Sequence, residues 1–343
     1  MLIRPIRQEE KKSYNQVVDH PLQSWEWGQF RSKTGLEVER VGFFQNGKLA
    51  NGIQATFHPI PFIGKTAGYV PKGFMPNEEQ LATLKQLGKQ HNALFIKLEP
   101  NVDAPVESSS AHYSIAEYLV KNGCQPGRPL FTKYSFVLDL DKDEDKLFAG
   151  LSSKTRYNVN LAYKKGVRIH ENSSKEGMEN YIEILEATKK RQGFYAHTPD
   201  YFRKMWESLG DSGMIRIFNA VYEDTILTTW VMFIFNDVLY YPYGASLRIH
   251  RDVMANNLMM WEMIKFGKEQ GCKTFDMWGS LGPNPDKKHA WYGFHRFKKG
   301  YGGVLHETLG TYDVVIDPVL YKPFRIVENL RWKALRLKAQ FNL

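Results

Sequence analysis

The chain has 343 residues, 43% of them hydrophobic and 24% charged, so it is long enough for two domains that each bury a core. Its formal net charge of +9 favours an anionic partner. No run approaches the roughly 20 apolar residues of a membrane-spanning helix, and the N-terminus lacks a signal-peptide core, which predicts a cytoplasmic protein. Cys124 and Cys272 have no metal-binding spacing and the histidines are scattered, so neither a disulfide framework nor a metal site is supported.

Two similar hairpins are predicted far apart in the chain. Apolar and polar residues alternate around Asn46-Gly47, a strong hairpin signal, and the pattern recurs around Glu223-Asp224. The units 87–100 and 266–279, each a helix end, a turn and a buried strand, align at nearly the same offset. A chance similarity is the alternative, but two matching offsets favour duplication of a domain. Each copy is expected to be a mixed α/β layer of the kind typical of GNAT acyltransferases.

An acidic and then polar stretch marks the boundary between the two copies. A helix is expected to begin at the capping residue Ser153 and to end at Gly166. We expect the first domain to comprise residues 1–137 together with a C-terminal helix at 318–343, and the second domain to comprise residues 138–317.

The C-terminal helix is predicted to be basic and amphipathic. Residues 319–343 contain one acidic residue, Glu328, and six basic residues: Lys322, Arg325, Arg331, Lys333, Arg336 and Lys338. One apolar stripe has spacings of three and four, formed by Val327, Leu330, Ala334, Leu337 and Phe341. The stripe favours packing on the first domain, and the alternatives are contact with nucleic-acid phosphates or with an anionic membrane surface.

The stretch Arg296–Gly303 has the character of a functional site. Lys298 follows an aromatic residue, Phe297, and precedes three glycines, a pattern that can bring a fixed positive charge close to a reacting carbonyl. The same stretch departs from the Arg/Gln-x-x-Gly-x-Gly/Ala loop with which GNAT enzymes bind pyrophosphate, which counts against acetyl-CoA. The rest of the sequence contains neither a phosphate loop nor a nucleophile elbow.

Several short motifs stand in a characteristic order: Ser24-Trp25-Glu26-Trp27 with Lys33, Tyr69-Val70-Pro71-Lys72-Gly73, Lys154-Thr155-Arg156-Tyr157-Asn158-Val159, Arg191-Gln192-Gly193-Phe194, Tyr243-Gly244-Ala245-Ser246, Asn256-Asn257-Leu258, and Phe297-Lys298-Lys299-Gly300-Tyr301-Gly302. Over nearly its whole length the chain resembles the FemABX peptidyltransferases. These proteins have two GNAT-like domains and add amino acids from aminoacyl-tRNA to the stem peptide of peptidoglycan precursors. No arm-like heptad run interrupts residues 150–318, so the chain resembles the compact, armless form.

The resemblance implies a tRNA-dependent aminoacyltransferase of interpeptide bridge synthesis. It implies no cofactor, with aminoacyl-tRNA as the co-substrate, and a UDP-linked or lipid-linked muropeptide precursor as acceptor. We expect a monomer that is cytoplasmic, with peripheral contact at the inner face of the membrane as the alternative. A GNAT-fold acyltransferase that uses acyl-CoA or another carrier, and a non-catalytic RNA- or membrane-binding protein, are the alternatives.

The resemblance also assigns roles to residues in the second domain. Lys298 matches the family's lysine proposed to stabilise the tetrahedral intermediate, and Phe297 is expected to stack on the terminal adenine or to shape the channel. Tyrosines that line the substrate channel match Tyr201, Tyr241 and Tyr243, and His197 stands where a relative has arginine. A basic helical face suited to tRNA comprises Arg156, Lys164 and Lys165, with Lys299 as a further contact and as the alternative to Lys298.

In the first domain the resemblance points to the acceptor. Lys33 or Arg31 is expected to bind the diphosphate of the precursor, and the resemblance does not distinguish between the two residues. Lys72 is expected to assist. Glu99 matches an acidic residue near the incoming amine, whereas Leu94 replaces a substrate-binding tyrosine of a close relative.

Overall fold

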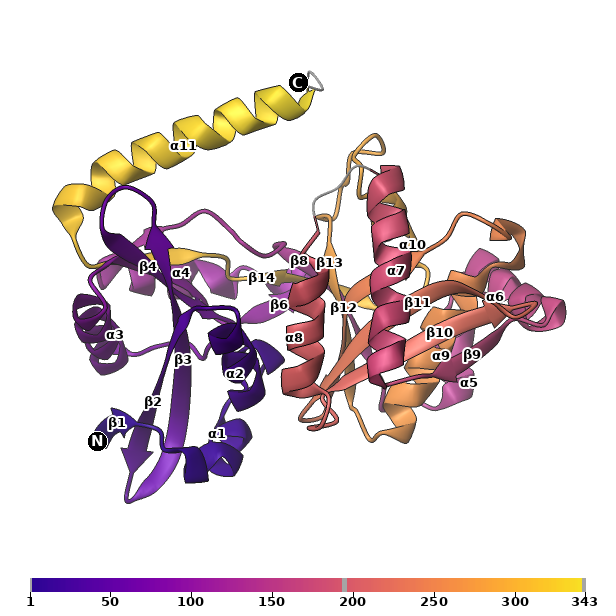
Figure 1. Cartoon of the computed structure of the whole chain (residues 1–343), viewed down its shortest axis with the longest axis horizontal. Coiled ribbons are helices and arrows are strands. Elements are labelled where there is room, and N and C mark those ends of the chain that lie inside the picture. The colour runs from indigo at the N-terminus through magenta and orange to yellow at the C-terminus, as the bar shows by residue number, and fades with distance from the viewer. Residues whose placement is uncertain (1, 193–195, 341–343) are drawn as a thin grey trace.

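The chain folds into two β-sheets that lie side by side and are covered by helices (Figure 1). The structure is a computed structural model that describes residues 2–192 and 196–340, without the side chains of residues 111, 192 and 335–340. The first sheet has seven strands, in the order β1 (Leu2–Pro5), β2 (Glu37–Gln45), β3 (Lys48–Ile60), β4 (Lys65–Pro71), β5 (Ala93–Glu99), β15 (Tyr312–Val315) and β7 (Cys124–Pro126). The second has eight, in the order β6 (Asp103–Pro105), β14 (Val304–Thr308), β8 (Tyr134–Asp139), β13 (Thr274–Ser280), β12 (Val238–Ser246), β11 (Thr225–Phe235), β10 (Ile215–Tyr222) and β9 (Arg168–Glu171).

The helices of the described residues cover these sheets. In chain order they are α1 (Lys11–Val17), α2 (Trp25–Lys33), α3 (Glu78–Gln90), α4 (Ala111–Lys121), α5 (Glu144–Gly150), α6 (Ser153–Lys165), α7 (Lys175–Gln192), α8 (Pro199–Leu209), α9 (Ala255–Glu269), α10 (Tyr292–Lys299) and α11 (Pro318–Gln340). One core lies between the first sheet and α3 and α4, and another between the second sheet and α5, α6 and α9.

The predicted duplication is confirmed in the strand order. In β2–β5 and in β10–β13, two antiparallel pairings are followed by a parallel one, and the parallel pair is joined through α3 or α9. The hairpin turns fall at Asn46-Gly47 and Glu223-Asp224, and all four residues have positive φ. Positive φ at both central positions defines the two-residue turn that matches the strand twist, so both turns follow from the same local chemistry.

Three strands do not follow the predicted division of the chain into two domains. The predicted boundary between residues 137 and 138 lies inside β8, which pairs with β13 and β14 of the second sheet. The strand β15, inside the range predicted for the second domain, lies in the first sheet between β5 and β7. The strand β6 in turn pairs with β14. Each sheet therefore contains a strand from the neighbouring part of the chain.

A third core joins the two sheets. It includes α1 and α2 from the first half of the chain and α7, α8 and β10–β12 from the second. The Trp27 ring lies 6.2 Å from Phe233, and Phe30 meets Tyr201 edge to face at 4.7 Å. Buried aromatic contacts of this kind hold the two halves together as one unit.

Two helix predictions need correction. The cap of α6 is Ser152, whose hydroxyl accepts from the Thr155 amide at 3.3 Å, and not Ser153; the helix ends at Gly166, in a left-handed conformation, as expected. The helix α11 does pack on the first sheet, where Tyr321 and Phe324 lie against Phe95. The predicted apolar stripe, however, is not the buried face, because Val327 and Leu330 are exposed. The stripe residues Leu337 and Phe341 lie outside the described side chains.

Candidate active site

Lys298 is a buried cation at the end of α10. Its Nζ donates hydrogen bonds to the carbonyl oxygens of Gly279 at 2.7 Å and Trp278 at 3.4 Å, and it lies 5.5 Å from the centroid of the Tyr241 ring. Burial lowers the pKa of Lys298 to about 8, and the nearby charge of Asp276 opposes this shift. Lys298 therefore remains mostly protonated at neutral pH and holds a proton that it can give up.

The carbonyls that hold Lys298 come from an irregularity in β13. The pairing register of β13 with β8 shifts between Asp276 and Gly279, and Trp278 has a φ of 60°. The Asp276 carboxylate accepts from the Trp278 amide at 2.7 Å and from the Ser135 hydroxyl, which stabilises this conformation. Burial raises the pKa of Asp276. A bulge of this kind turns backbone groups out of the ladder, here toward the lysine.

A cluster of aromatic rings that includes Tyr241 lies beside the lysine, in the core of the second sheet. Phe297 is half-buried and meets Tyr301 at 5.3 Å and Trp230 at 6.4 Å, both edge to face. Trp230 stacks on Tyr241 at 3.9 Å. Phe297 thus packs on the core with part of its ring while the rest remains accessible, and Lys299 is exposed beside it.

A second group of the predicted residues meets where the two halves of the chain join. The guanidinium of Arg31 lies 5.8 Å from the Tyr201 ring, and His197 stacks on that ring at 3.8 Å. Tyr243 interacts with the Tyr201 hydroxyl, and burial raises the pKa of both tyrosines. Arg31 therefore lies in an aromatic setting that spans both domains.

Lys33 lies apart from this group. Its ammonium is 3.8 Å from the Glu207 carboxylate of α8, and both side chains are exposed. The structure thus separates the two residues between which the sequence did not choose. Arg31 faces the tyrosines, and Lys33 forms a surface pair.

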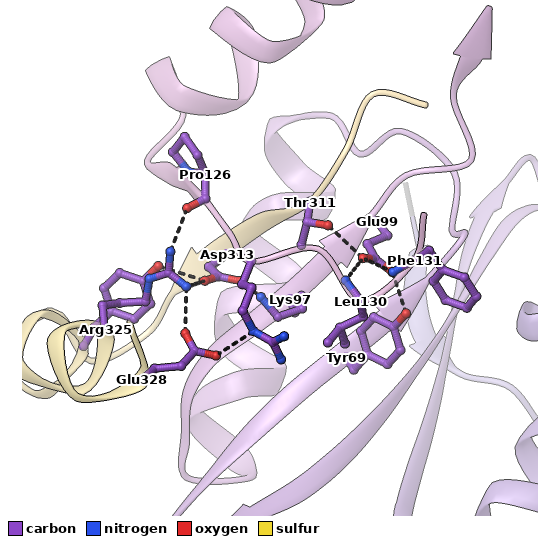
Figure 2. Close-up of polar contacts among 12 residues, drawn as sticks. Tyr69, Lys97, Glu99, Pro126, Leu130, Phe131, Thr311, Asp313, Arg325 and Glu328 are labelled. Atoms are coloured by element: carbon purple, nitrogen blue, oxygen red, sulfur yellow. Dashed lines mark hydrogen bonds and ion pairs between the residues drawn. The ribbon is translucent and has the colours of Figure 1, made fainter. Parts of the chain in front are cut away.

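Glu99 and Lys72 line a pocket of about 190 Å³ next to the first sheet. Figure 2 shows how the Glu99 carboxylate is held. Its Oε1 accepts from the amides of Leu130 at 2.8 Å and Phe131 at 3.3 Å and from the Thr311 hydroxyl at 2.7 Å, whereas Oε2 accepts from the Tyr69 hydroxyl at 2.5 Å. An incoming amine would therefore meet Oε2, the oxygen with acceptor capacity left.

A larger pocket, of about 340 Å³, was missed by the sequence reasoning. It opens where β12 ends and α9 begins, and we call it the arginine pocket; its lining includes Arg191, Ser246, Arg248, His250, Arg251 and Asn257. Arg191 donates to the Ser246 carbonyl at 3.0 Å, and its buried Nε has no partner among the described residues. Three arginines that line a pocket next to the N-terminus of α9 favour anions.

The arginine pocket adjoins both the predicted tRNA face and the lysine site. Lys165 of α6 forms an ion pair with Asp252 of the pocket loop at 3.6 Å, and Lys164 is exposed beside it, whereas Arg156 is engaged with the carbonyls of Ala149 and Leu151. On the other side, Asn257 donates to the hydroxyl of Tyr301, the ring that packs on Phe297. The run Arg248-Ile249-His250-Arg251 after a strand was the sequence signal available.

Comparisons with known proteins place this architecture. A tandem GNAT protein from the clavulanic acid biosynthesis pathway has the same fold, with a TM-score of 0.55 at 11% identity over 92% of this chain and 99% of that one. The crystal structure of FemX matches with a TM-score of 0.82 at 22% identity, over 94% of this chain and 99% of that chain. The expected pair of tandem GNAT-like domains is therefore confirmed.

The FemAB family model matches residues 6–223 and 213–329, so the chain belongs to the FemAB family, as its motifs predicted. The lipid II:glycine glycyltransferase of Staphylococcus haemolyticus (strain JCSC1435) is 25% identical over 410 aligned positions, which cover 95% of each chain. Because this chain has 343 residues, that relative carries segments that this chain lacks, which agrees with the compact form.

Among the residues that the structure describes, none of the helices has both the length and the apolar character needed to cross a membrane.

Proposed function

We propose that this protein transfers an amino acid from aminoacyl-tRNA to the stem peptide of a peptidoglycan precursor, as a transferase of interpeptide bridge synthesis. Membership of the FemAB family and the names of its glycyltransferase relatives support the reaction class. The observation that carries the proposal is Lys298, a buried cation held by backbone carbonyls beside a partly accessible aromatic ring.

The chemistry requires little beyond positioning and one cation. The amine of the stem peptide attacks the ester carbonyl of aminoacyl-tRNA, so that a C–N bond forms and the C–O bond to the ribose breaks. The amine loses a proton and the departing ribose oxygen gains one. Negative charge develops first on the carbonyl oxygen and then on the ribose oxygen, which Lys298 can stabilise and, with a pKa of about 8, protonate.

The arginine pocket is suited to the donor. Phosphates of the tRNA acceptor end carry the charge that Arg191, Arg248 and Arg251 attract, and Lys164 lies on the adjoining face. Asn257 of the pocket donates to the Tyr301 hydroxyl, and the Tyr301 ring packs on Phe297, so a terminal adenine stacked on Phe297 would lie next to Lys298. No further cofactor enters this reaction scheme, because the aminoacyl ester is already activated.

The acceptor is assigned to the groups between and beside the two halves. Arg31 with its tyrosines, Lys72 and Glu99 are proposed to bind a muropeptide precursor. The relatives' name favours a lipid-linked precursor over a nucleotide-linked one. We further propose that the protein acts as a monomer in the cytoplasm, in contact with the membrane surface where a lipid-linked precursor lies.

The decisive assay combines purified protein with a panel of charged tRNAs and with both precursor types. Mass spectrometry is expected to show the precursor extended by one amino acid with at least one charged tRNA, and no extension with acyl-CoA. Transfer from acyl-CoA, with none from any charged tRNA, would contradict the proposal.

We expect Arg31→Met to raise the dissociation constant of the precursor about tenfold or more, because a charge-assisted contact contributes about 1.5 to 3 kcal/mol. Lys33→Met is the matched control and is expected to change it less, since Lys33 lies on the surface with Glu207. Titration calorimetry measures both. Equal, unchanged affinity in the two variants would remove the diphosphate contact from this part of the site.

Replacing Arg248 and Arg251 together by Met is expected to weaken tRNA binding by about tenfold or more and to make it less sensitive to salt, since each lost phosphate contact reduces the salt slope by about one. Filter binding at several salt concentrations tests this. Precursor affinity serves as the internal control and is expected to stay the same. A salt slope equal to that of the wild type would exclude the arginine pocket as a phosphate site.

The rate of transfer is expected to fall as the pH rises above about 8. Burial lowers the pKa of Lys298 to about 8, so its cation is present below that pH and is lost above it. Single-turnover rates measured from neutral to alkaline pH give the profile. The descending limb is expected to vanish in Lys298→Met, and its persistence there would assign it to another group.

A further inference from the structure

Large apolar side chains are exposed on one part of the surface, on α11 and on the turn between β3 and β4. Phe62 in this turn is fully exposed, and Ile63 is 44% exposed. On α11 the exposed fractions are 79% for Val319, 63% for Val327 and 59% for Leu330, and Leu320 and Ile326 are exposed as well. Scattered exposed residues need no explanation, but this many on two adjoining elements indicates an interaction site.

The helix α11 has two opposite apolar faces. One packs on the first sheet through Tyr321 and Phe324, and continues with Glu328 and Trp332, whose ring lies 4.0 Å under Arg128. The other faces solvent, at helical spacings of three and four, and shares Val327, Leu330 and Ala334 with the stripe predicted from the sequence. From here on, the apolar stripe means the exposed residues Val319, Pro323, Ile326, Val327, Leu330 and Ala334. Since the first face already attaches the helix, the stripe is free to bind something else.

The β3–β4 turn lies beside the first turns of α11, as Figure 1 shows. Ile60, at the end of β3, packs in the same cluster as Tyr321 and Phe324, and Lys65, at the start of β4, forms an ion pair with Asp317 at 3.2 Å. Phe62 at the tip has a φ of 71°, which is unfavourable for a bulky residue. Two elements that are distant in sequence and that both carry exposed apolar side chains are therefore neighbours in the fold.

The charge around the stripe is positive. Lys322, Arg331 and Lys333 are exposed on α11. The acid of this helix, Glu328, is already paired with Arg325 at 2.8 Å and Arg128 at 3.4 Å. An apolar stripe flanked by Lys and Arg fits the boundary between anionic lipid headgroups and acyl chains. RNA phosphates would use the cations but would leave the aliphatic stripe and Phe62 unburied.

We propose that the apolar stripe of α11, together with Phe62 and Ile63, binds the surface of an anionic lipid bilayer. The helix lies in the plane of the interface, with the stripe among the first acyl carbons and the basic residues at the phosphates. Only the consequence for catalysis rests on the proposed function: docking would bring the active site to a lipid-linked precursor. Binding to the bilayer itself requires no transferase activity.

Co-sedimentation of the full chain with vesicles provides the test. We expect binding to vesicles of equal parts phosphatidylglycerol and phosphatidylcholine, and binding at least about tenfold weaker to phosphatidylcholine alone, because each basic residue near an anionic surface adds to the attraction. The double variants Val327→Ser/Leu330→Ser and Phe62→Ser/Ile63→Ser are each expected to weaken binding about tenfold, because the apolar area buried per side chain is lost. The matched control is Tyr113→Ser, a side chain 81% exposed on α4, which packs in the core with α3 and not in the cluster that holds α11.

Unchanged vesicle binding in both double variants would overturn the proposal. So would a concentration-dependent dimer that the Val327→Ser/Leu330→Ser change dissolves, which would assign the stripe to a second copy, or binding to tRNA alone with none to vesicles. Vesicle binding with no transfer to either precursor supports this inference while contradicting the proposed function. If both hold, the double variants are expected to slow transfer to vesicle-embedded precursor much more than transfer to the soluble, nucleotide-linked one.

Discussion

Lys298→Met is expected to reduce aminoacyl transfer about a hundredfold or more while leaving precursor affinity nearly unchanged. The cation is needed where charge develops in the transition state and not where the ground state is held, so the loss falls on kcat and not on KM. Removal of one such stabilising donor typically costs about 2.7 to 4 kcal/mol. Methionine fills nearly the same volume, so the buried site is expected to keep its packing.

Single-turnover transfer and precursor calorimetry measured on the same samples check this result. The matched control is Lys299→Met, the adjacent exposed lysine, for which we expect a much smaller loss. The carbonyls of Trp278 and Gly279 fix the Lys298 ammonium, so Lys298→Arg, whose planar guanidinium does not fit that position, is expected to restore little activity. Full transfer activity in Lys298→Met would exclude the mechanism even though the family is established.

Much of the fold was predictable because local chemistry agrees with it. Asn46-Gly47 predicted a tight hairpin turn, and the recurrence of the pattern at Glu223-Asp224 indicated the duplication. It was not predictable that each sheet would contain a strand from the neighbouring part of the chain. The strands β6 and β15 have three and four residues, too few to show a period of two, and their pairing depends on partners far away in the chain.

Local sequence pattern identified the candidate site only where its residues are neighbours in sequence, whereas Arg31 and Tyr201, which meet in the structure, were assigned through the family resemblance. Phe297 and Lys298 could be identified in this way, whereas the arginine pocket joins Arg191 of α7 to a loop more distant in the chain. The α11 stripe shows a different limit. Periodicity identified an amphipathic helix, but it did not reveal that Tyr321 and Phe324 supply a second apolar face, and these larger rings are the ones that pack.

Asp313→Ala is expected to lower the free energy of unfolding by about 3 to 5 kcal/mol, the usual cost of leaving a buried charge without its partner. Asp313 has no exposed surface and accepts from the Lys97 ammonium at 2.6 Å and from the Tyr321 hydroxyl at 2.8 Å, with Arg325 at 3.8 Å (Figure 2). The substitution leaves the Lys97 ammonium buried without a counter-ion and removes one of the polar contacts that attach α11 to the first sheet.

The midpoint of urea unfolding measures this loss, and hydrogen exchange of the α11 amides reports whether the helix detaches. Asp237→Ala is the matched control, because Asp237 and Lys273 form an exposed pair at 3.5 Å and such pairs contribute about 0 to 1 kcal/mol. Adding Lys97→Met to Asp313→Ala is expected to recover much of the stability, since no buried charge then remains unpaired. An effect of Asp313→Ala no larger than that of Asp237→Ala, or a double variant less stable than the single one, would show that the Lys97 charge is compensated by other groups.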